Sequence, residues 1–145
     1  MNREILFRAK AINRDSNREY RTNYKNGDWV YGLVSRAYHD YYSNFHIEMT
    51  NEDGVSGIDV DYNTLGQYIG LTDKNGTKIF EGDIVKCEWG FLSNGSYHHY
   101  EDFIVEFKDS AYYIVPIKKH KNIWTVYLNP ESEYEVVGNI YDTNI

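Results

Sequence analysis

Two aspartates, Asp59 and Asp61, lie two residues apart in a segment where they alternate with apolar residues. Side chains two apart on a β-strand point to the same side, so both carboxylates would face one way. Together with Asp53 or Glu52 they could hold Mg²⁺ or Ca²⁺ through oxygen ligands. The alternative is a solvated strand face beside an acidic turn, because no glycine-centred calcium loop accompanies the pair. A metal-dependent enzyme is therefore a third-ranked hypothesis.

Histidine and cysteine show no spacing typical of a metal or catalytic site. His98 and His99 are adjacent, so on a strand they would point to opposite sides and could not easily bind one ion. The single cysteine, Cys87, alternates with Val85 and Trp89 and is predicted to be a small buried hydrophobic residue. No local base would activate it, and no phosphate-binding loop or nucleophile elbow occurs. We therefore expect no catalytic residue, no metal, no cofactor and no enzymatic activity.

A basic cluster, Lys118, Lys119, His120 and Lys121, lies at a predicted hairpin tip. Aromatic residues on the neighbouring predicted strands could stack bases beside it; these are Tyr112, Tyr113, Trp124 and Tyr127. The alternative is a lysine-rich tip that keeps a sheet edge from aggregating. The formal net charge of −7 argues against a general nucleic-acid binder, because phosphate binding needs a surplus of basic residues. A small nucleic-acid-binding barrel is therefore the second hypothesis.

Tyrosine is unusually frequent, with 15 residues, and Tyr38, Tyr41 and Tyr42 form a local group. Tyrosine is common at interfaces because its ring is apolar while its hydroxyl can stay hydrated. If the three rings are exposed together, they form a patch suited to a protein partner or to self-association. If they are buried, they cap the contact between two lobes. The leading hypothesis is a non-enzymatic protein-binding or self-assembling module.

The elements that must position these residues are predicted from a dominant period of two in hydrophobicity. The strands expected in this way are residues 5–11, 29–34, 45–49, 58–61, 66–71, 84–89, 103–107, 112–117, 124–128 and 135–141. One alternative remains at residues 34–42, where Leu33, Ala37 and Tyr41 recur every fourth residue, as in a short helix. The chain is thus expected to be mostly β, with a polar N-terminal lobe (1–62) and a compact second lobe (63–145) that pack as one unit.

The chain's size and composition fit a folded protein that needs no disulfide. It has 145 residues, of which 41% are hydrophobic, and a chain of this length buries roughly two-thirds of its unfolded surface. No apolar run approaches the roughly 18 residues of a membrane helix, and the first residues do not resemble a secretory signal. We expect a cytoplasmic protein.

The segment from Val60 to Val85, VDYNTLGQYIGLTDKNGTKIFEGDIV, resembles the central signature of the YopX family. Four further segments resemble its opening and closing strands: 3–9, 29–32, 104–107 and 135–141. The resemblance covers nearly the whole chain, and departs from the family pattern at Tyr62, Asn63 and Lys10. It implies a phage or prophage protein of a bacterial host cell and an SH3-like barrel in the C-terminal part. It implies no catalytic residue, cofactor or ligand.

The signature also has a structural interpretation that requires no ligand. Glycines at turns permit a positive φ angle or close backbone approach, and Asn75-Gly76 predicts a hairpin with a primed turn. Side chains such as Asp73 and Asp83 can bond turn amides. The residues to which we assign this structural role are Gly66, Gln67, Tyr68, Gly70, Asp73, Asn75, Gly76, Gly82 and Asp83. A binding groove beside the hairpin is the alternative.

Overall fold

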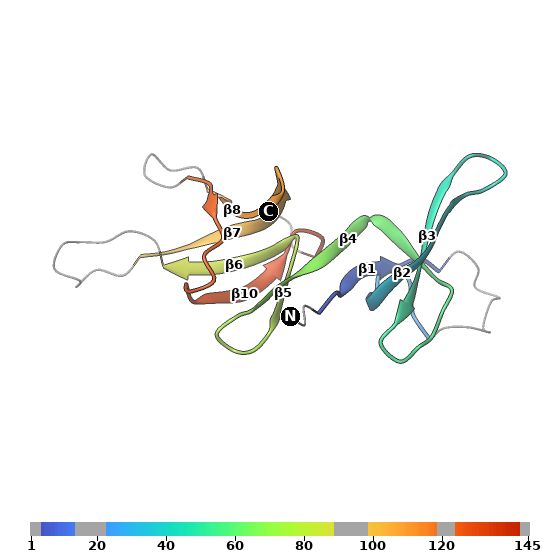
Figure 1. Cartoon of the computed structure of the whole chain (residues 1–145), viewed down its shortest axis with the longest axis horizontal. Coiled ribbons are helices and arrows are strands. Elements are labelled where there is room, and N and C mark those ends of the chain that lie inside the picture. The colour runs from blue at the N-terminus through green and yellow to red at the C-terminus, as the bar shows by residue number, and fades with distance from the viewer. Residues whose placement is uncertain (1–3, 14–22, 89–98, 119–123, 143–145) are drawn as a thin grey trace. The chain divides into compact units, whose positions relative to one another are not determined.

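The computed structural model describes residues 4–13, 23–88, 99–118 and 124–142 (Figure 1). These residues form strands and turns and contain no helix, so the prediction of a mostly β protein is confirmed. The strands of the described residues are β1 (Phe7–Ala11), β2 (Trp29–His39), β3 (Phe45–Asn51), β4 (Ile58–Thr72), β5 (Lys78–Phe80), β6 (Asp83–Glu88), β7 (Tyr100–Lys108), β8 (Ala111–Pro116), β9 (Val126–Tyr127) and β10 (Tyr134–Asn139).

The alternative of a short helix at residues 34–42 is wrong. Strand β2 continues to His39 and pairs with β3 in an antiparallel ladder that reaches His39 opposite Phe45. Leu33 and Tyr41, two of the residues at helical spacing, are 51% and 94% exposed. A helix gains most of its stability by packing an apolar face, and here that face would have had nothing to cover.

The chain divides into two compact units, residues 1–68 and 69–145. The division lies inside β4, whose first part pairs in the first unit while its end neighbours β5 in the second. The lobe boundary expected after residue 62 falls in the same strand. The prediction that the two lobes pack together stays a prediction.

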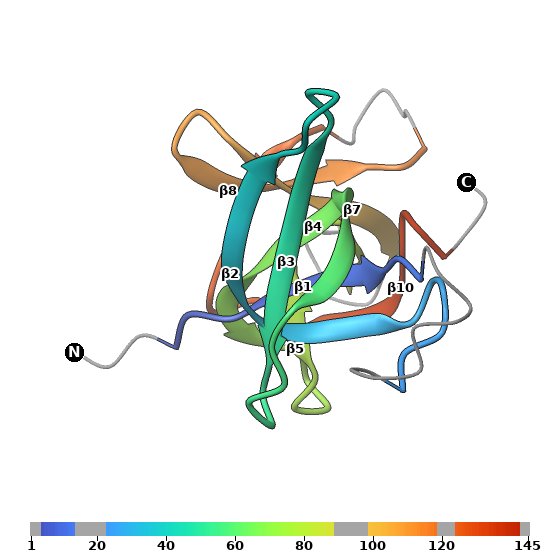
Figure 2. The same ribbon diagram turned by 90° about the vertical axis from the view of Figure 1, so that its right-hand side faces the viewer.

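In the first unit, the strand pairings form a closed cycle (Figure 2). Strand β1 pairs with β2 on one side and with β4 on the other, and β3 pairs with both β2 and β4. Alternate side chains of the four strands point inward, as the period of two requires. They form a core of Ala9, Ala11, Val30, Ile47, Met49, Ile58 and Val60. At the end of the β1–β2 ladder Lys10 lies opposite Trp29, and the ammonium of Lys10 is 5.4 Å from the centre of the Trp29 ring.

The second unit contains an antiparallel sheet with the strand order β10-β6-β7-β8-β9. The core residues of β6 and β7 lie two apart, Val85 and Cys87 on β6 and Phe103 and Val105 on β7, and all four are buried. Ile84, between Asp83 and Val85, is buried as well. The rest of this core is made by Ile69, Ile79, Ile114 and Tyr134. Among the residues described, no helix is long and apolar enough to cross a membrane.

Candidate interaction site

The β2–β3 hairpin extends beyond the strands that flank it. Strand β1 pairs with β2 only from Trp29 to Gly32, and β4 pairs with β3 only from Ile47 to Met49. We call residues 33–46 the hairpin arm. It comprises the part of β2 without β1 beside it, the turn, and the start of β3 without β4 beside it, and only residues 38–46 lack both flanking strands. Its tip is the cyan loop above the β3 label at the upper right of Figure 1, and it stands above β2 and β3 in Figure 2.

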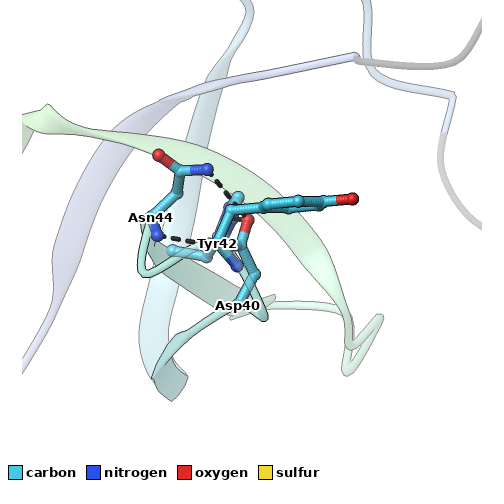
Figure 3. A network of polar contacts seen from close by, with 4 residues as sticks. Asp40, Tyr42 and Asn44 are labelled. Atoms are coloured by element: carbon cyan, nitrogen blue, oxygen red, sulfur yellow. Dashed lines mark hydrogen bonds and ion pairs between the residues drawn. The ribbon is translucent and has the colours of Figure 1, made fainter.

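The turn at the tip is organised by the carboxylate of Asp40 (Figure 3). One oxygen accepts hydrogen bonds from the backbone N–H groups of Tyr42 and Asn44, at 2.8 and 2.9 Å. The other oxygen contacts the side-chain amide of Asn44 at 3.3 Å and the Nε2 of His46 at 2.8 Å. Ser43, which lies between Tyr42 and Asn44, has a positive φ of 63°. These four contacts converge on one carboxylate and join both sides of the turn.

These contacts shift the ionisation of Asp40. The hydrogen bond from His46, followed by the backbone N–H of Asn44, lowers the pKa of the carboxyl to about 2. Hydrogen bonds that favour the charged form of a carboxyl lower its pKa in this way. Asp40 is therefore ionised at neutral pH, and its charge is directed into the turn.

The turn presents two tyrosine rings to solvent. Tyr41 is 94% and Tyr42 is 81% exposed, and the rings meet edge to face with their centres 5.4 Å apart. In Figure 3 the Tyr42 ring extends away from the Asp40 carboxylate. Tyr38, the third member of the predicted group, lies on β2 and is half-buried. Its ring stacks on His46 at 5.1 Å and lies under the guanidinium of Arg36 at 4.1 Å.

Sequence reasoning did not include a second pair of aromatic rings, which lies beside the turn at the tip of the arm. Phe45 and Tyr62 meet edge to face at 5.3 Å and are 37% and 47% exposed. Phe45 continues the alternation of Ile47 and Met49, so the pattern placed all three on one face. The core ends at Ile47 on this face of β3. The ring of Phe45 therefore lies outside the core, where it contacts the ring of His39. The end of the core could not be located from alternation alone.

The predicted basic cluster is described only at its first residue and its neighbours. Lys118 is exposed, whereas Lys119, His120 and Lys121 lie outside the described residues. Trp124 is 59% exposed, and Tyr127 stacks on Tyr113 with a centre distance of 4.6 Å. Two rings that stack on each other leave fewer faces open for a base. The nucleic-acid hypothesis stays a prediction.

The residues considered for metal binding and catalysis occupy separate places. Asp59 and Asp61 lie on β4, and the Asp61 carboxylate accepts a hydrogen bond from the N–H of Asn63 at 3.0 Å. His99 contacts Glu101 at 2.6 Å, and His98 lies outside the described residues. In the described part of the chain, no three His, Cys, Asp or Glu side chains gather as a metal site would require.

Cys87 is buried in the core of the second unit. Desolvation is the main cause that raises the pKa of its thiol to about 11, and the charge of Asp102 adds to it.

The first signature aspartate, Asp73, connects three parts of the second unit. Its carboxylate accepts hydrogen bonds from the N–H groups of Asn75, Thr77 and Val136, at 2.8 to 2.9 Å.

The predicted β4–β5 hairpin is present, but its turn is not the primed type. Gly76 has a positive φ of 81° while Asn75 does not, and the N–H of Asp73 bonds the carbonyl of Thr77. This is a three-residue loop with glycine in the left-handed position.

The remaining signature residues join neighbouring segments of backbone. Asp83 is buried and accepts a hydrogen bond from the N–H of Phe80 at 2.8 Å. Gly82, with a φ of 85°, donates its N–H to Val105 and accepts one from Ile140. In the first unit, Gly66 and Gln67 pair with β1 and the N–H of Tyr68 donates to the carbonyl of Leu6. In the second unit, Gly70 has a φ of 89°. Asp73, Asp83, Gly76 and Gly82 thus make turn contacts of the kind expected for a structural role, whereas Gly66 and Gln67 lie within β4 rather than at a turn.

The sequence model described as YopX protein matches residues 8–144. A search of curated proteins found no match.

Proposed function

The chain belongs to the YopX family, and we propose that it is a non-enzymatic protein-binding module that makes contact through the tip of its hairpin arm. The observation that carries this proposal is the exposure of Tyr41 and Tyr42 on a turn held by Asp40. Large aromatic rings are enriched in the residues that dominate binding energy at protein interfaces.

The rigidity of the turn supports the same proposal. A binding surface that is already ordered loses less conformational entropy when a partner arrives. The Asp40 carboxylate bonds both Tyr42 and Asn44 on the far side of the turn, so the backbone of Tyr41 and Tyr42 is ordered before binding. A solvated turn with no binding role needs no such pair of exposed rings, because polar residues would serve it equally well.

The partner that we propose is a host or phage protein, or a second copy of the chain. The setting is the cytoplasm of a bacterial cell that carries the protein on a phage or prophage, as the resemblance implied. We also retain the SH3-like barrel for the C-terminal part as a proposal. A solved structure of residues 63–145 with strands closed into such a barrel would support it.

The test is an affinity pull-down from bacterial host lysate, with and without nuclease, followed by binding of the purified prey. The variant pair Tyr41→Ser and Tyr42→Ser is expected to abolish capture without changing the fold. Tyr100→Ser is the matched control, because Tyr100 is also exposed, at 56%, but lies on β7 in the other unit. Prey that binds the double variant as well as the native protein would contradict the proposal. Prey that disappears with nuclease would favour the nucleic-acid hypothesis.

A further inference from the structure

The hairpin arm has a strand edge that no described strand covers. On the side of β2 away from β3, pairing with β1 ends where Phe7 lies opposite Gly32. From residue 33 to residue 39, no strand of the described residues continues that ladder. An uncovered edge presents unpaired N–H and C=O groups and is a template for another strand.

The direction of the backbone groups along this edge follows from the turn. The N–H of Asp40 donates to the carbonyl of Asn44 at 2.9 Å, so Asp40 directs its backbone groups toward β3. Tyr38 lies opposite His46, two residues before Asp40, so its backbone groups also point toward β3. Backbone groups alternate between the two sides of a strand in an antiparallel pair. Ala37 and His39 therefore direct their N–H and C=O groups outward, to the uncovered side.

We propose that this edge pairs with the same edge of a second copy of the chain, antiparallel, with Ala37 of each copy opposite His39 of the other. This inference rests on the proposed function, since it names one partner of the hairpin arm. An antiparallel edge is self-complementary about a two-fold axis, so one set of residues serves both sides of the contact. In this register the two copies of Tyr38 meet at the axis.

Charge is the reason for choosing a second copy as the occupant. The same register places Arg36 of each copy opposite Asp40 of the other. The Asp40 carboxylate keeps the hydrogen bonds of its own turn, so the attraction is between two pairs of opposite charges and adds no new hydrogen bond. The side chain of Arg36 is 61% exposed; its guanidinium lies 4.1 Å from the centre of the Tyr38 ring and makes a long contact of 3.9 Å to Glu48. An exposed pair of that length contributes little, so Arg36 can be shared. Residues 33–46 contain one arginine and one aspartate, so the arm is neutral although the chain carries −7.

The extent of this edge limits the strength of the contact. The β2–β3 register shifts between Val34 and Arg36, where Ser35 forms a bulge. A bulge bends and twists its strand, so regular pairing is confined to the residues after it. The contact is therefore short, and we expect a weak, concentration-dependent dimer of the kind that buries less than about 1,200 Å².

The register can be tested by cross-linking. Residues opposite each other at a non-hydrogen-bonded position lie about 4.5 Å apart between Cα atoms, which fits the geometry of a disulfide. Tyr38→Cys is expected to form a covalent dimer under mild oxidation. Leu33→Cys is the control, because its two copies would lie roughly 30 Å apart along the ribbon. The native Cys87 is buried and should not cross-link. Equal cross-linking of both variants, or none with Tyr38→Cys, would overturn the proposal.

The edge itself can be tested without a new cysteine, by sedimentation over a wide range of concentrations. Ala37→Pro removes an outward N–H while leaving the bonds to β3, and should weaken dimerisation about tenfold, as the loss of about one or two hydrogen bonds implies. Ala37→Val keeps the N–H and should dimerise normally. Arg36→Glu should also weaken the dimer, because it places two acidic groups opposite each other, and it does not depend on the folding of the proline variant.

The outcomes separate this inference from the proposed function. A native protein that stays monomeric at every concentration overturns the inference, and so does a dimer that neither Ala37→Pro nor Arg36→Glu weakens. In both cases, capture of prey that depends on Tyr41 and Tyr42 would leave the proposed function standing. Conversely, a dimer sensitive to both variants supports the inference even if the lysate supplies no prey.

Discussion

The carboxylate of Asp73 and the backbone N–H of Val136 form a hydrogen bond of 2.9 Å across 63 residues of sequence. The same carboxylate accepts the amides of Asn75 and Thr77, so one side chain ties the β4–β5 turn to strand β10. Burial alone would raise the pKa of Asp73, but these backbone bonds outweigh it and lower the pKa below its usual value. The signature aspartate thus has a structural task within the second unit.

Asp73→Ala should destabilise the second unit by about 2 kcal/mol or more, because hydrogen bonds to a charged group are lost and turn amides are left without their acceptor. The unfolding free energy is measured by urea denaturation. The hydrogen exchange rates of the β10 amides then report whether the second unit is the part that is destabilised. Asp53→Ala is the control, since Asp53 is an exposed turn residue of the first unit and should change stability by less than about 0.5 kcal/mol. Equal effects of the two substitutions would contradict the assigned role.

The turn at the arm's tip should respond to acid in a defined range. The pKa of Asp40 is lowered to about 2, so its ionised form favours the folded turn. A lowered carboxyl pKa contributes stability above the unfolded value, and that contribution is lost as the pH falls through the folded value. The amide signals of Tyr42 and Asn44 in NMR should therefore move together with a midpoint near pH 2. A midpoint at or above the ordinary aspartate value of 3.8 would show that the carboxylate is not held as described.

Gly32→Ala should be the most damaging glycine substitution in the first unit. A Cβ at Gly32 would lie 1.9 Å from the carbonyl oxygen of Thr50 and 2.8 Å from the Cα of Asn51, both backbone atoms that cannot move aside cheaply. We expect a loss of about 3 kcal/mol in unfolding free energy, as for severe overpacking. Gly54→Ala is the comparison, because its Cβ meets nothing within 4 Å. Its positive φ should cost only about 1 kcal/mol.

Cys87 should be inert in the folded protein. Its side chain is buried and desolvation raises the pKa of its thiol to about 11, so almost no thiolate exists at pH 8. A thiol-reactive dye should label the native protein very slowly and the urea-unfolded protein at the rate of an ordinary cysteine. Rapid labelling without denaturant would mean that Cys87 is an activated nucleophile, and would reopen the case for an enzyme.

Several features were predictable because they depend on neighbours in the sequence. Alternation at Val85 and Cys87 predicted strand β6 and its inward face, and the DKNG segment predicted the β4–β5 hairpin. The type of that turn was not predictable, because Asp73 closes a loop one residue longer through its bond with Thr77. Residues 34–42 allowed both a helix and a strand locally, and the long ladder with β3 favoured the strand.

The sequence by itself determined that this protein is mostly β, where most of its strands lie and which family it belongs to, because hydrophobic period and glycine punctuation are local properties of the chain. Only the tertiary structure decided that β1 and β4 stop short of the β2–β3 tip, which turns Tyr41 and Tyr42 outward. Whether a ring is buried depends on which strands reach it. Strand length and register are set by contacts between residues distant in sequence, which no local pattern contains.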